Sequence, residues 1–213
     1  MKILSVQVGR PRPVTFGGHV AQTGIYKNPV HGPVRVGTLN LDGDEQADLT
    51  VHGGVNKAVY AYPSEHYEFW RRQYPSRALE WGAFGENLTT EGLLETDAGI
   101  GDMIQIGTAL FVVIQPRLPC YKLAGKFDDK NILQTFTDSG RSGIYFAVVE
   151  EGHIQSGDEI VWESRQDHPF TIADAMRLYN GQELPSDLLH RALQLKALPD
   201  SWRREVQEAL SQK

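Results

Sequence analysis

The sequence predicts a mainly β protein of the α+β class, in which a turn-rich β-barrel is followed by a small bundle of three helices. Short apolar or alternating runs, which are typical of strands, recur between clusters of Gly, Pro and Asp over most of the chain. Of the 21 glycines, all but Gly181 lie in this part, as the turns of a barrel require. After Trp162 the apolar residues recur every three to four positions, which indicates helices.

Seven runs are predicted to be strands, because each is apolar or alternates with a period of two. They are residues 3–8, 34–41, 58–62, 103–106, 109–114, 144–150 and 159–162. One helix interrupts them. Ser64 is suited to cap its start, Tyr67, Trp70 and Tyr74 share one face, and Pro75 ends it. We interpret this aromatic stripe as core packing.

The polar residues 163–169 end in a proline and indicate a domain boundary, so we divide the chain into residues 1–165 and 166–213. Thr171, Ser186 and Asp200 are the expected N-caps of three short helices. This bundle carries as many basic as acidic residues, and therefore lacks the positive charge with which small helical modules bind DNA. We interpret it as a packing or docking element.

Composition and charge exclude several classes of protein. The net charge of −6 argues against a nucleic-acid-binding protein and against binding to anionic membranes. The first apolar run is interrupted by Ser5 and Gln7, so it does not resemble a signal peptide, and no later run reaches transmembrane length. With a single cysteine as well, the expected location is a reducing cytoplasm.

That cysteine, Cys120, is the first candidate functional residue. Alone it cannot form an internal disulfide. Two nearby prolines stiffen the backbone, and Arg117 and Lys122 place positive charge close to the sulfur, which favours a thiolate. Such a sulfur suits a nucleophile or a soft metal ligand. An inert, buried cysteine is the equally weighted alternative.

A second candidate segment contains His52, two glycines and Lys57 ahead of a predicted strand. A flexible turn with exposed N–H groups and a cation suits an anion, although an ordinary Gly-Gly turn fits as well. The acidic residues before it do not form a calcium loop, because Ala47 stands where an EF-hand needs Gly and Gly53 where it needs Glu.

Two further segments are rich in residues that suit ligand binding. Gly82 and Gly85 allow close approach of a ligand to the backbone, and Asn87 offers donors and acceptors to a polar heterocycle. Arg141, between two Ser-Gly pairs, suits a clamp for phosphate or an oxyanion. A tight turn with a solvated arginine is the alternative.

The standard nucleotide and hydrolase motifs are absent from the sequence: there is no zinc-protease signature, phosphate-binding loop, dinucleotide fingerprint or nucleophile elbow. A pairing of Cys120 with His52 for papain-like chemistry is disfavoured. Such a cysteine opens a helix, whereas Cys120 is predicted to follow a strand and a proline.

Taken together and in order, these segments resemble the MOSC domain, a module shared with molybdenum-cofactor sulfurases, and specifically its bacterial YiiM-like branch. The matching stretches are residues 43–48, 52–54, 82–88, 115–123 and 139–143, and the C-terminal helices also fit that branch. The resemblance implies a closed, mixed and antiparallel β-barrel with a pterin-based molybdenum cofactor (molybdopterin) in a surface cleft.

The resemblance also assigns residues to the cofactor. It implies that the thiolate of Cys120 is the molybdenum ligand and the catalytic residue. The residues implied to hold the pterin and its phosphate are His52, Gly53, Lys57, Phe84, Gly85, Glu86, Asn87, Arg117 and Arg141.

For this branch the implied reaction is the reduction of small N-hydroxylated compounds, such as hydroxylaminopurine base analogues, to amines, with detoxification as its role. The sequence shows no flavin or nicotinamide fingerprint, and one cysteine cannot hold a four-cysteine iron–sulfur cluster. Electrons are therefore expected from a separate flavin or iron–sulfur reductase. The chain is expected to be a monomer or a homodimer.

Two alternatives to the enzyme remain open at this point. In one, Cys120 carries sulfur as a persulfide, or carries the cofactor, without turnover. In the other, the barrel has lost the cofactor and the helical bundle is an interaction module.

Overall fold

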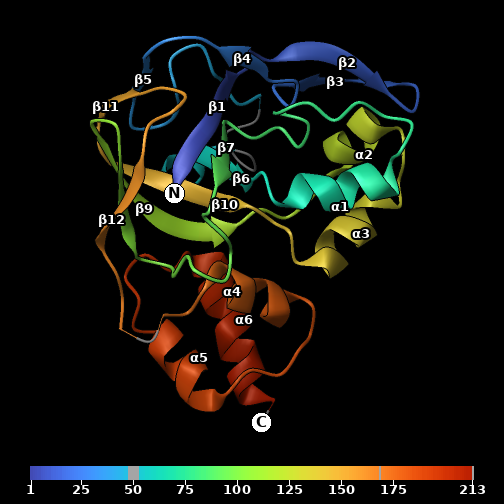
Figure 1. Ribbon diagram of the computed structural model, residues 1–213. Coiled ribbons are helices and arrows are strands. Elements are labelled where there is room, and N and C mark those ends of the chain that lie inside the picture. Colours follow the sequence, from blue (N-terminus) through green and yellow to red (C-terminus); the bar gives the residue numbers. More distant parts are fainter. Residues whose placement is uncertain (48–52, 168, 213) are drawn as a thin grey trace.

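The computed structural model describes residues 1–47, 53–167 and 169–212, which form one large mixed sheet with helices against it (Figure 1). Only β6 and β7 pair in parallel; the other neighbours in this sheet are antiparallel. In spatial order the strands are β12 (Ile160–Ser164), β8 (Met103–Ile106), β9 (Ala109–Pro116), β10 (Ile144–Glu150), β6 (Val59–Pro63), β7 (Leu88–Glu91), β1 (Lys2–Val8) and β4 (Asn28–Val30).

The sheet curls round but does not close into a barrel in the part of the chain that is described. β12 is at one end of the order, and the chain just before it meets the start of β1 through an isolated bridge between Lys2 and Glu159 and a few backbone hydrogen bonds, such as that from the Ile3 N–H to the Asp158 carbonyl at 2.9 Å. β4 occupies the edge of β1 from Val6 onward, so only the first residues of β1 are left for β12. The expectation of a closed barrel is wrong for this reason, while the mixed, mainly β character is confirmed.

Two small ladders lie outside the large sheet. β2 (Arg12–Phe16) and β3 (His19–Thr23) form a hairpin, and β5 (Val34–Val36) pairs with β11 (Gly152–Ile154). The hairpin rests on the helix that follows Cys120. A side chain at Gly125 would collide with the ring of Phe16, since a Cβ there would lie 1.8 Å from it. The sequence did not predict the hairpin, because its residues are mostly exposed and polar.

Three helices pack beside one end of the sheet (Figure 1): α1 (His66–Gln73), α2 (Tyr121–Phe127) and α3 (Ile132–Ser139). A short 3-10 turn, η1 (Val55–Lys57), precedes β6. The predicted helix is α1, although its N-cap is Glu65 rather than Ser64. Tyr67 and Trp70 are fully buried, which confirms the aromatic stripe as core packing.

The C-terminal helices are α4 (Ile172–Tyr179), α5 (Ser186–Ala192) and α6 (Asp200–Ser211). Thr171 caps α4 as predicted: its hydroxyl accepts the Asp174 N–H at 3.0 Å and the Asp174 carboxylate accepts the Thr171 N–H at 3.1 Å. Ser186 and Asp200 are the first helical residues rather than the caps. No helix in the described residues is long and apolar enough to cross a bilayer.

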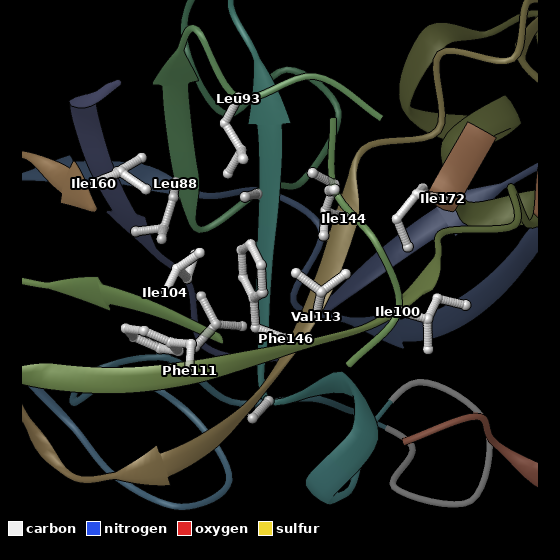
Figure 2. Packing of buried hydrophobic residues seen from close by; sticks show 14 of the residues in the cluster. Leu88, Leu93, Ile100, Ile104, Phe111, Val113, Ile144, Phe146, Ile160 and Ile172 are labelled. Carbon is white, nitrogen blue, oxygen red and sulfur yellow. The ribbon is translucent and has the colours of Figure 1, made fainter. Parts of the chain in front are cut away.

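One hydrophobic cluster runs through the sheet and the C-terminal helices (Figure 2). Phe111 and Phe146 of the sheet, Ile172 of α4 and Trp202 and Val206 of α6 all belong to it. The hydrophobic core therefore continues across the boundary near residue 165, where strands give way to helices. The bundle completes the burial of the sheet.

A second cluster, in which aromatic residues are the majority, joins α1, α2 and α3 to the sheet. Phe84 lies at its centre, with ring centroids 4.7 Å from Tyr62, 5.2 Å from Trp70 and 5.4 Å from Phe127. The indole N–H of Trp70 donates to the Tyr62 hydroxyl at 2.6 Å, so the polar groups in this cluster are also paired. This packing fixes the loop that carries Phe84.

Truncation of Phe84 should be costly. Phe84→Ala is expected to lower the free energy of unfolding by about 3–5 kcal/mol, because a fully buried ring leaves a cavity. Val161→Ala, at a 50% exposed strand position, is the control and should change it by less than about 0.5 kcal/mol. Urea denaturation of the two variants measures both. A loss below about 1 kcal/mol for Phe84→Ala would contradict the packing described above.

Candidate functional site

An open cleft lies beside Cys120. One wall is the chain after β3 together with the acidic loop at residues 44–47. The other wall is the 85–87 loop and the segment from Arg117 to Lys122, and the floor is formed by Tyr60 of β6 and Tyr145 of β10. Six segments that are distant in sequence therefore line the cleft beside Cys120.

Cys120 is half-buried and is the N-cap residue of α2. Its carbonyl accepts the Leu123 N–H at 2.8 Å, so the helix begins directly after it. The prediction that Cys120 does not open a helix is wrong. Pro119 holds the chain extended up to the cysteine, and the turn into the helix follows at once. His52, its suggested partner, lies outside the described residues.

Arg117 is buried behind the cysteine, and its Nη1 donates to the carbonyl of Phe84. Its guanidinium lies over the rings of Tyr60 (5.0 Å) and Phe136 (5.6 Å). Burial alone would lower the pKa of Arg117, but Tyr60, Tyr145 and the Cys120 thiol raise it above its ordinary value. The same attraction favours the anionic form of the sulfur.

A buried network centred on Asp44 holds the opposite wall. Its Oδ1 accepts the Gly9 N–H at 2.8 Å and the ammonium of Lys27, and its Oδ2 accepts the Asn87 amide at 2.9 Å. The Asn87 Oδ1 in turn accepts the Tyr60 N–H at 3.1 Å. Burial lowers the pKa of Lys27, and Asp44 opposes that effect. Asn87 lines the cleft, but its amide is engaged in joining β6 to the acidic loop.

Glu86 and Phe84 point away from the cleft. The buried carboxylate of Glu86 accepts the N–H groups of Gly82 (2.8 Å) and Phe84 (3.1 Å), and the hydroxyls of Thr89 (3.1 Å) and Tyr67. Gly85 does line the cleft. Glycine is required there by the fold itself, since its φ is +78° and a Cβ would lie 2.8 Å from Ile25.

Lys126 of α2 joins the two walls from behind. Its Nζ donates to the carbonyls of Ile25 at 3.1 Å and Gly82 at 2.7 Å. Burial lowers the pKa of Lys126 to about 8, although Glu86 opposes the effect. Lys122, one turn earlier, lines the cleft directly.

Cys120 also borders a second cavity, on the side of the C-terminal helices. Lys57 of η1 and Tyr145 line it together with Tyr179 and Trp202. Burial lowers the pKa of Lys57. It raises the pKa of Tyr145 and, more strongly, that of Tyr60, so both phenols stay neutral. The cysteine thus stands between a cleft lined by charged residues of both signs and a more apolar groove.

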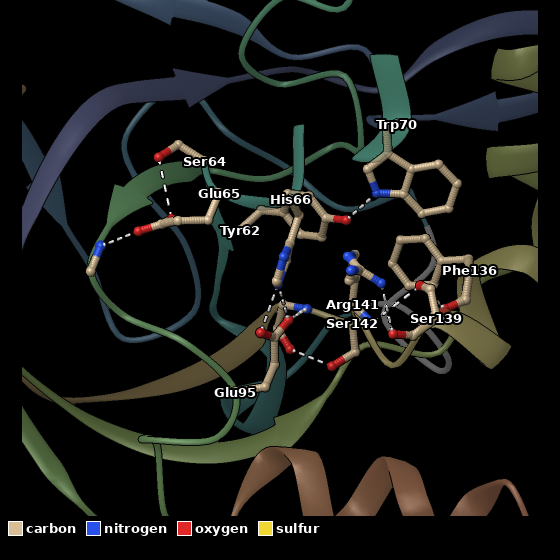
Figure 3. A network of polar contacts seen from close by, with 12 residues as sticks. Tyr62, Ser64, Glu65, His66, Trp70, Glu95, Phe136, Ser139, Arg141 and Ser142 are labelled. Atoms are coloured by element: carbon tan, nitrogen blue, oxygen red, sulfur yellow. Dashed lines mark hydrogen bonds and ion pairs between the residues drawn. The ribbon is translucent and has the colours of Figure 1, made fainter. Parts of the chain in front are cut away.

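Arg141 is not in the lining of either cavity beside Cys120 and lies near His66 and Glu95 instead (Figure 3). Gly140, at φ 65°, ends α3 and turns the chain, and the Arg141 guanidinium lies 4.2 Å from the centre of the Phe69 ring. It borders a separate depression, next to a His66–Glu95 pair at 2.7 Å. Gly53 lies in the loop before η1.

Sequence reasoning did not select four residues that line the cleft: Lys27, Asp44, Tyr60 and Tyr145. Asp44 stands inside one of the matched motifs and could have been chosen there. The tyrosines lie on predicted strands, where an aromatic residue is ordinarily core. Lys27 gives no local signal, because only the fold pairs it with Asp44. In the described residues no group of three His, Cys, Asp or Glu side chains forms a metal cluster.

A family model described as "MOSC domain" matches residues 48–161, more than half of the chain. The chain belongs to the MOSC family. A second model, "YiiM-like, 3-alpha helix domain", matches residues 170–212 and identifies the YiiM-like branch. MOSC domains as a class are associated with the molybdenum cofactor, so a role related to that cofactor fits this MOSC protein.

Three curated relatives resemble this MOSC protein over most of its length. YflK of Bacillus subtilis is 40% identical over 201 residues, covering 94% of this chain and 90% of YflK. YiiM of Escherichia coli is 38% identical over 186 residues, covering 86% and 83%. A protein of Gibberella moniliformis named "Reductase" is 32% identical over 196 residues, which are 91% of this chain but 35% of the fungal protein.

Solved structures of YiiM share the fold. The crystal structure of YiiM from Geobacillus stearothermophilus has a TM-score of 0.79 at 36% identity, with 98% of each chain covered. That of Escherichia coli YiiM has a TM-score of 0.76 at 31% identity, covering 100% of this chain and 94% of the other. The MOSC sheet and the three C-terminal helices therefore occur together in these YiiM proteins as they do here.

The buried Lys126 predicts a pH dependence of stability. From pH 8 to 10.5 the unfolded chain binds a proton at this lysine that the folded chain does not, so the free energy of unfolding rises with pH. Relative to Lys126→Met, the wild type should gain up to about 3 kcal/mol across this range. Urea denaturation of both proteins at pH 7.5, 9 and 10.5 measures the difference. If the difference in free energy of unfolding between the two proteins does not change with pH, the lowered pKa of Lys126 is contradicted.

Proposed function

We propose that this chain holds a molybdenum cofactor in the cleft beside Cys120 and reduces small N-hydroxylated compounds to amines. The observation that carries the proposal is the position of the sulfur. It stands at the junction of a charged cleft, which Arg117 and Lys122 line, and a more apolar groove, in a chain of the MOSC family. One cavity can hold an anionic cofactor while the other admits a substrate.

The residues of the cleft fit such a cofactor. A thiolate is a ligand that soft, thiol-binding metals prefer, and one protein ligand suffices for a metal already chelated by a pterin. Arg117 and Lys122 bring positive charge to the lining beside Cys120 and so suit the phosphate of the pterin, while Lys27 is paired with Asp44. When bound, the molybdenum centre would supply the two-electron, oxygen-atom chemistry.

The reaction balances as R–NHOH + 2 e⁻ + 2 H⁺ → R–NH₂ + H₂O. The N–O bond breaks, and the oxygen leaves as water. Lys57 borders the same groove as Cys120 and has a lowered pKa, so it is the side chain suited to donate a proton to the departing oxygen. Tyr60 and Tyr145 have raised pKa values and stay neutral, so neither adds negative charge beside the sulfur.

The two electrons come from a separate flavin or iron–sulfur reductase. With one cysteine, this chain cannot hold a four-cysteine cluster of its own. The fungal relative supports the proposal that a separate protein or domain supplies the electrons. It is named a reductase, and about two thirds of it lies outside the match, which leaves room for further domains in that protein.

A carrier of sulfur or of the cofactor is the second candidate. The observation that favours it is the exposure of the residues flanking the cysteine, 38% for Leu118 and 55% for Tyr121, which leaves Cys120 within reach of a partner protein. Metal analysis of fresh protein separates the two functions. Molybdenum in about equal amount to chain supports the enzyme, and persulfide sulfur without molybdenum supports the carrier.

Cys120→Ser should lose molybdenum and activity while its folding is unchanged. Serine is nearly isosteric but is a harder, less acidic donor. Molybdenum content is measured by mass spectrometry, activity with 6-hydroxylaminopurine and a reduced viologen, and folding by thermal unfolding. If the variant keeps its molybdenum and its normal activity, Cys120 is not the metal ligand. Loss of folding would show instead that the cysteine is a core residue.

Two arginine variants test which guanidinium holds the cofactor. Arg117→Lys keeps the charge but loses the planar fork, so its pterin and molybdenum content should fall to well below half of the wild type. Arg141→Lys makes the same change in a separate depression and should leave that content unaltered. Equal losses in both would place Arg141 at the cofactor, as the sequence predicted. If Arg117→Lys keeps the full pterin and molybdenum content, Arg117 does not hold the cofactor.

A further inference from the structure

The second cavity beside Cys120 is a groove lined by residues of both the sheet and the C-terminal helices. Its floor is the end of β9 and the loop from Leu118 to Cys120. One wall is the end of α4, at Tyr179, with the first turns of α6, at Trp202 and Glu205; Lys57 and Tyr145 line the opposite side. We call it the Tyr179 groove.

Hydrogen bonds hold its walls in place. The indole N–H of Trp202 donates to the Gln115 Oε1 at 3.1 Å, which ties α6 to the end of β9. The Gln115 amide donates to the carbonyl of Asn56 at 3.1 Å, which ties β9 to η1. Asn180 donates to the carbonyl of Thr137 at 3.0 Å and fixes the end of α4 against α3. The groove is therefore formed before any ligand arrives.

Its surface suits a flat ring. Leu118 and Tyr179 are 38% and 44% exposed, and Trp202 supports Tyr179 from behind with ring centroids 6.2 Å apart. The charged residues of its lining are Lys57 and Glu205, which stand on different walls. Aromatic and apolar faces with a carboxylate at the edge match a heteroaromatic ring that carries N–H donors.

We propose that the Tyr179 groove binds the ring of the substrate, with the N–OH group directed towards Cys120 and the cofactor on the other side of the sulfur. Tyr179 stacks on the ring, and Glu205 accepts a hydrogen bond from its N–H edge. The C-terminal helices are then part of the active site. The inference rests on the proposed function for the chemistry, but ring binding itself requires no turnover.

Binding of adenine, the amine product of 6-hydroxylaminopurine, tests the groove without catalysis. Calorimetric titration of the full chain should give about 5- to 100-fold weaker binding for Tyr179→Ala, the range for one lost base–aromatic stack. Tyr179→Phe keeps the ring and should stay within about threefold of the wild type. Tyr121→Ala is the matched control, because Tyr121 is 55% exposed and is outside the lining of the groove.

A second variant and a second substrate complete the test. Glu205→Ala should weaken adenine binding more than binding of 9-methyladenine, which lacks the ring N–H. In the molybdenum-loaded protein with reduced viologen, Tyr179→Ala should raise KM for 6-hydroxylaminopurine and leave KM for hydroxylamine, which has no ring, unchanged.

The outcomes separate the two proposals. Unaltered adenine affinity in both Tyr179→Ala and Glu205→Ala overturns the groove as the ring site, whatever the protein catalyses. Loss of affinity in these variants, with no reduction of any hydroxylamine by the loaded wild type, overturns the proposed function and leaves the ring site standing. An equal rise of KM for both substrates in Tyr179→Ala also overturns ring recognition.

Discussion

The buried carboxylate of Glu86 fixes the loop on which the rest of the site depends. A carboxylate without water is tolerated only when hydrogen-bond donors surround it, and four donors from its own loop, from β7 and from α1 converge on this one. The loop is left with one conformation. In that conformation the carbonyl of Phe84 holds Arg117, and Asn87 reaches Asp44. Both walls of the cleft are therefore positioned from a single buried charge.

These contacts hold the residues around the Cys120 sulfur in fixed positions. Arg117 is held by a carbonyl and two aromatic rings, so its charge does not move away from Cys120. Lys126 joins the walls from behind, and the Trp202–Gln115 hydrogen bond does the same for the groove. A site in which protein groups are already oriented gives up little free energy to reorganisation when a cofactor and a substrate bind.

Local patterns were enough to predict much of the sheet, the aromatic face of α1 and the capping box at Thr171, because their signals lie within a few residues of one another. The orientation of Glu86 and Phe84 could not be read in this way, since the donors and rings that bury them come from other elements. The failure of the sheet to close could not be predicted from local patterns either, because it depends on where β4 pairs with β1. For Arg141, the sequence showed a suitable residue type but not the turn at Gly140 that directs it elsewhere.

The shared core has a consequence for how the protein matures. The cleft and the groove draw on residues from Thr23 to Glu205, and the first strand meets the chain near Glu159. Contacts of such long sequence separation form late, because a large loop must be closed before any of them adds stability. A chain still emerging from the ribosome thus has its thiol but neither of the cavities beside it. Under the proposed function, cofactor and substrate can therefore bind only after these segments have folded together, and α6, which contributes Trp202 and Glu205, is the element that completes the groove.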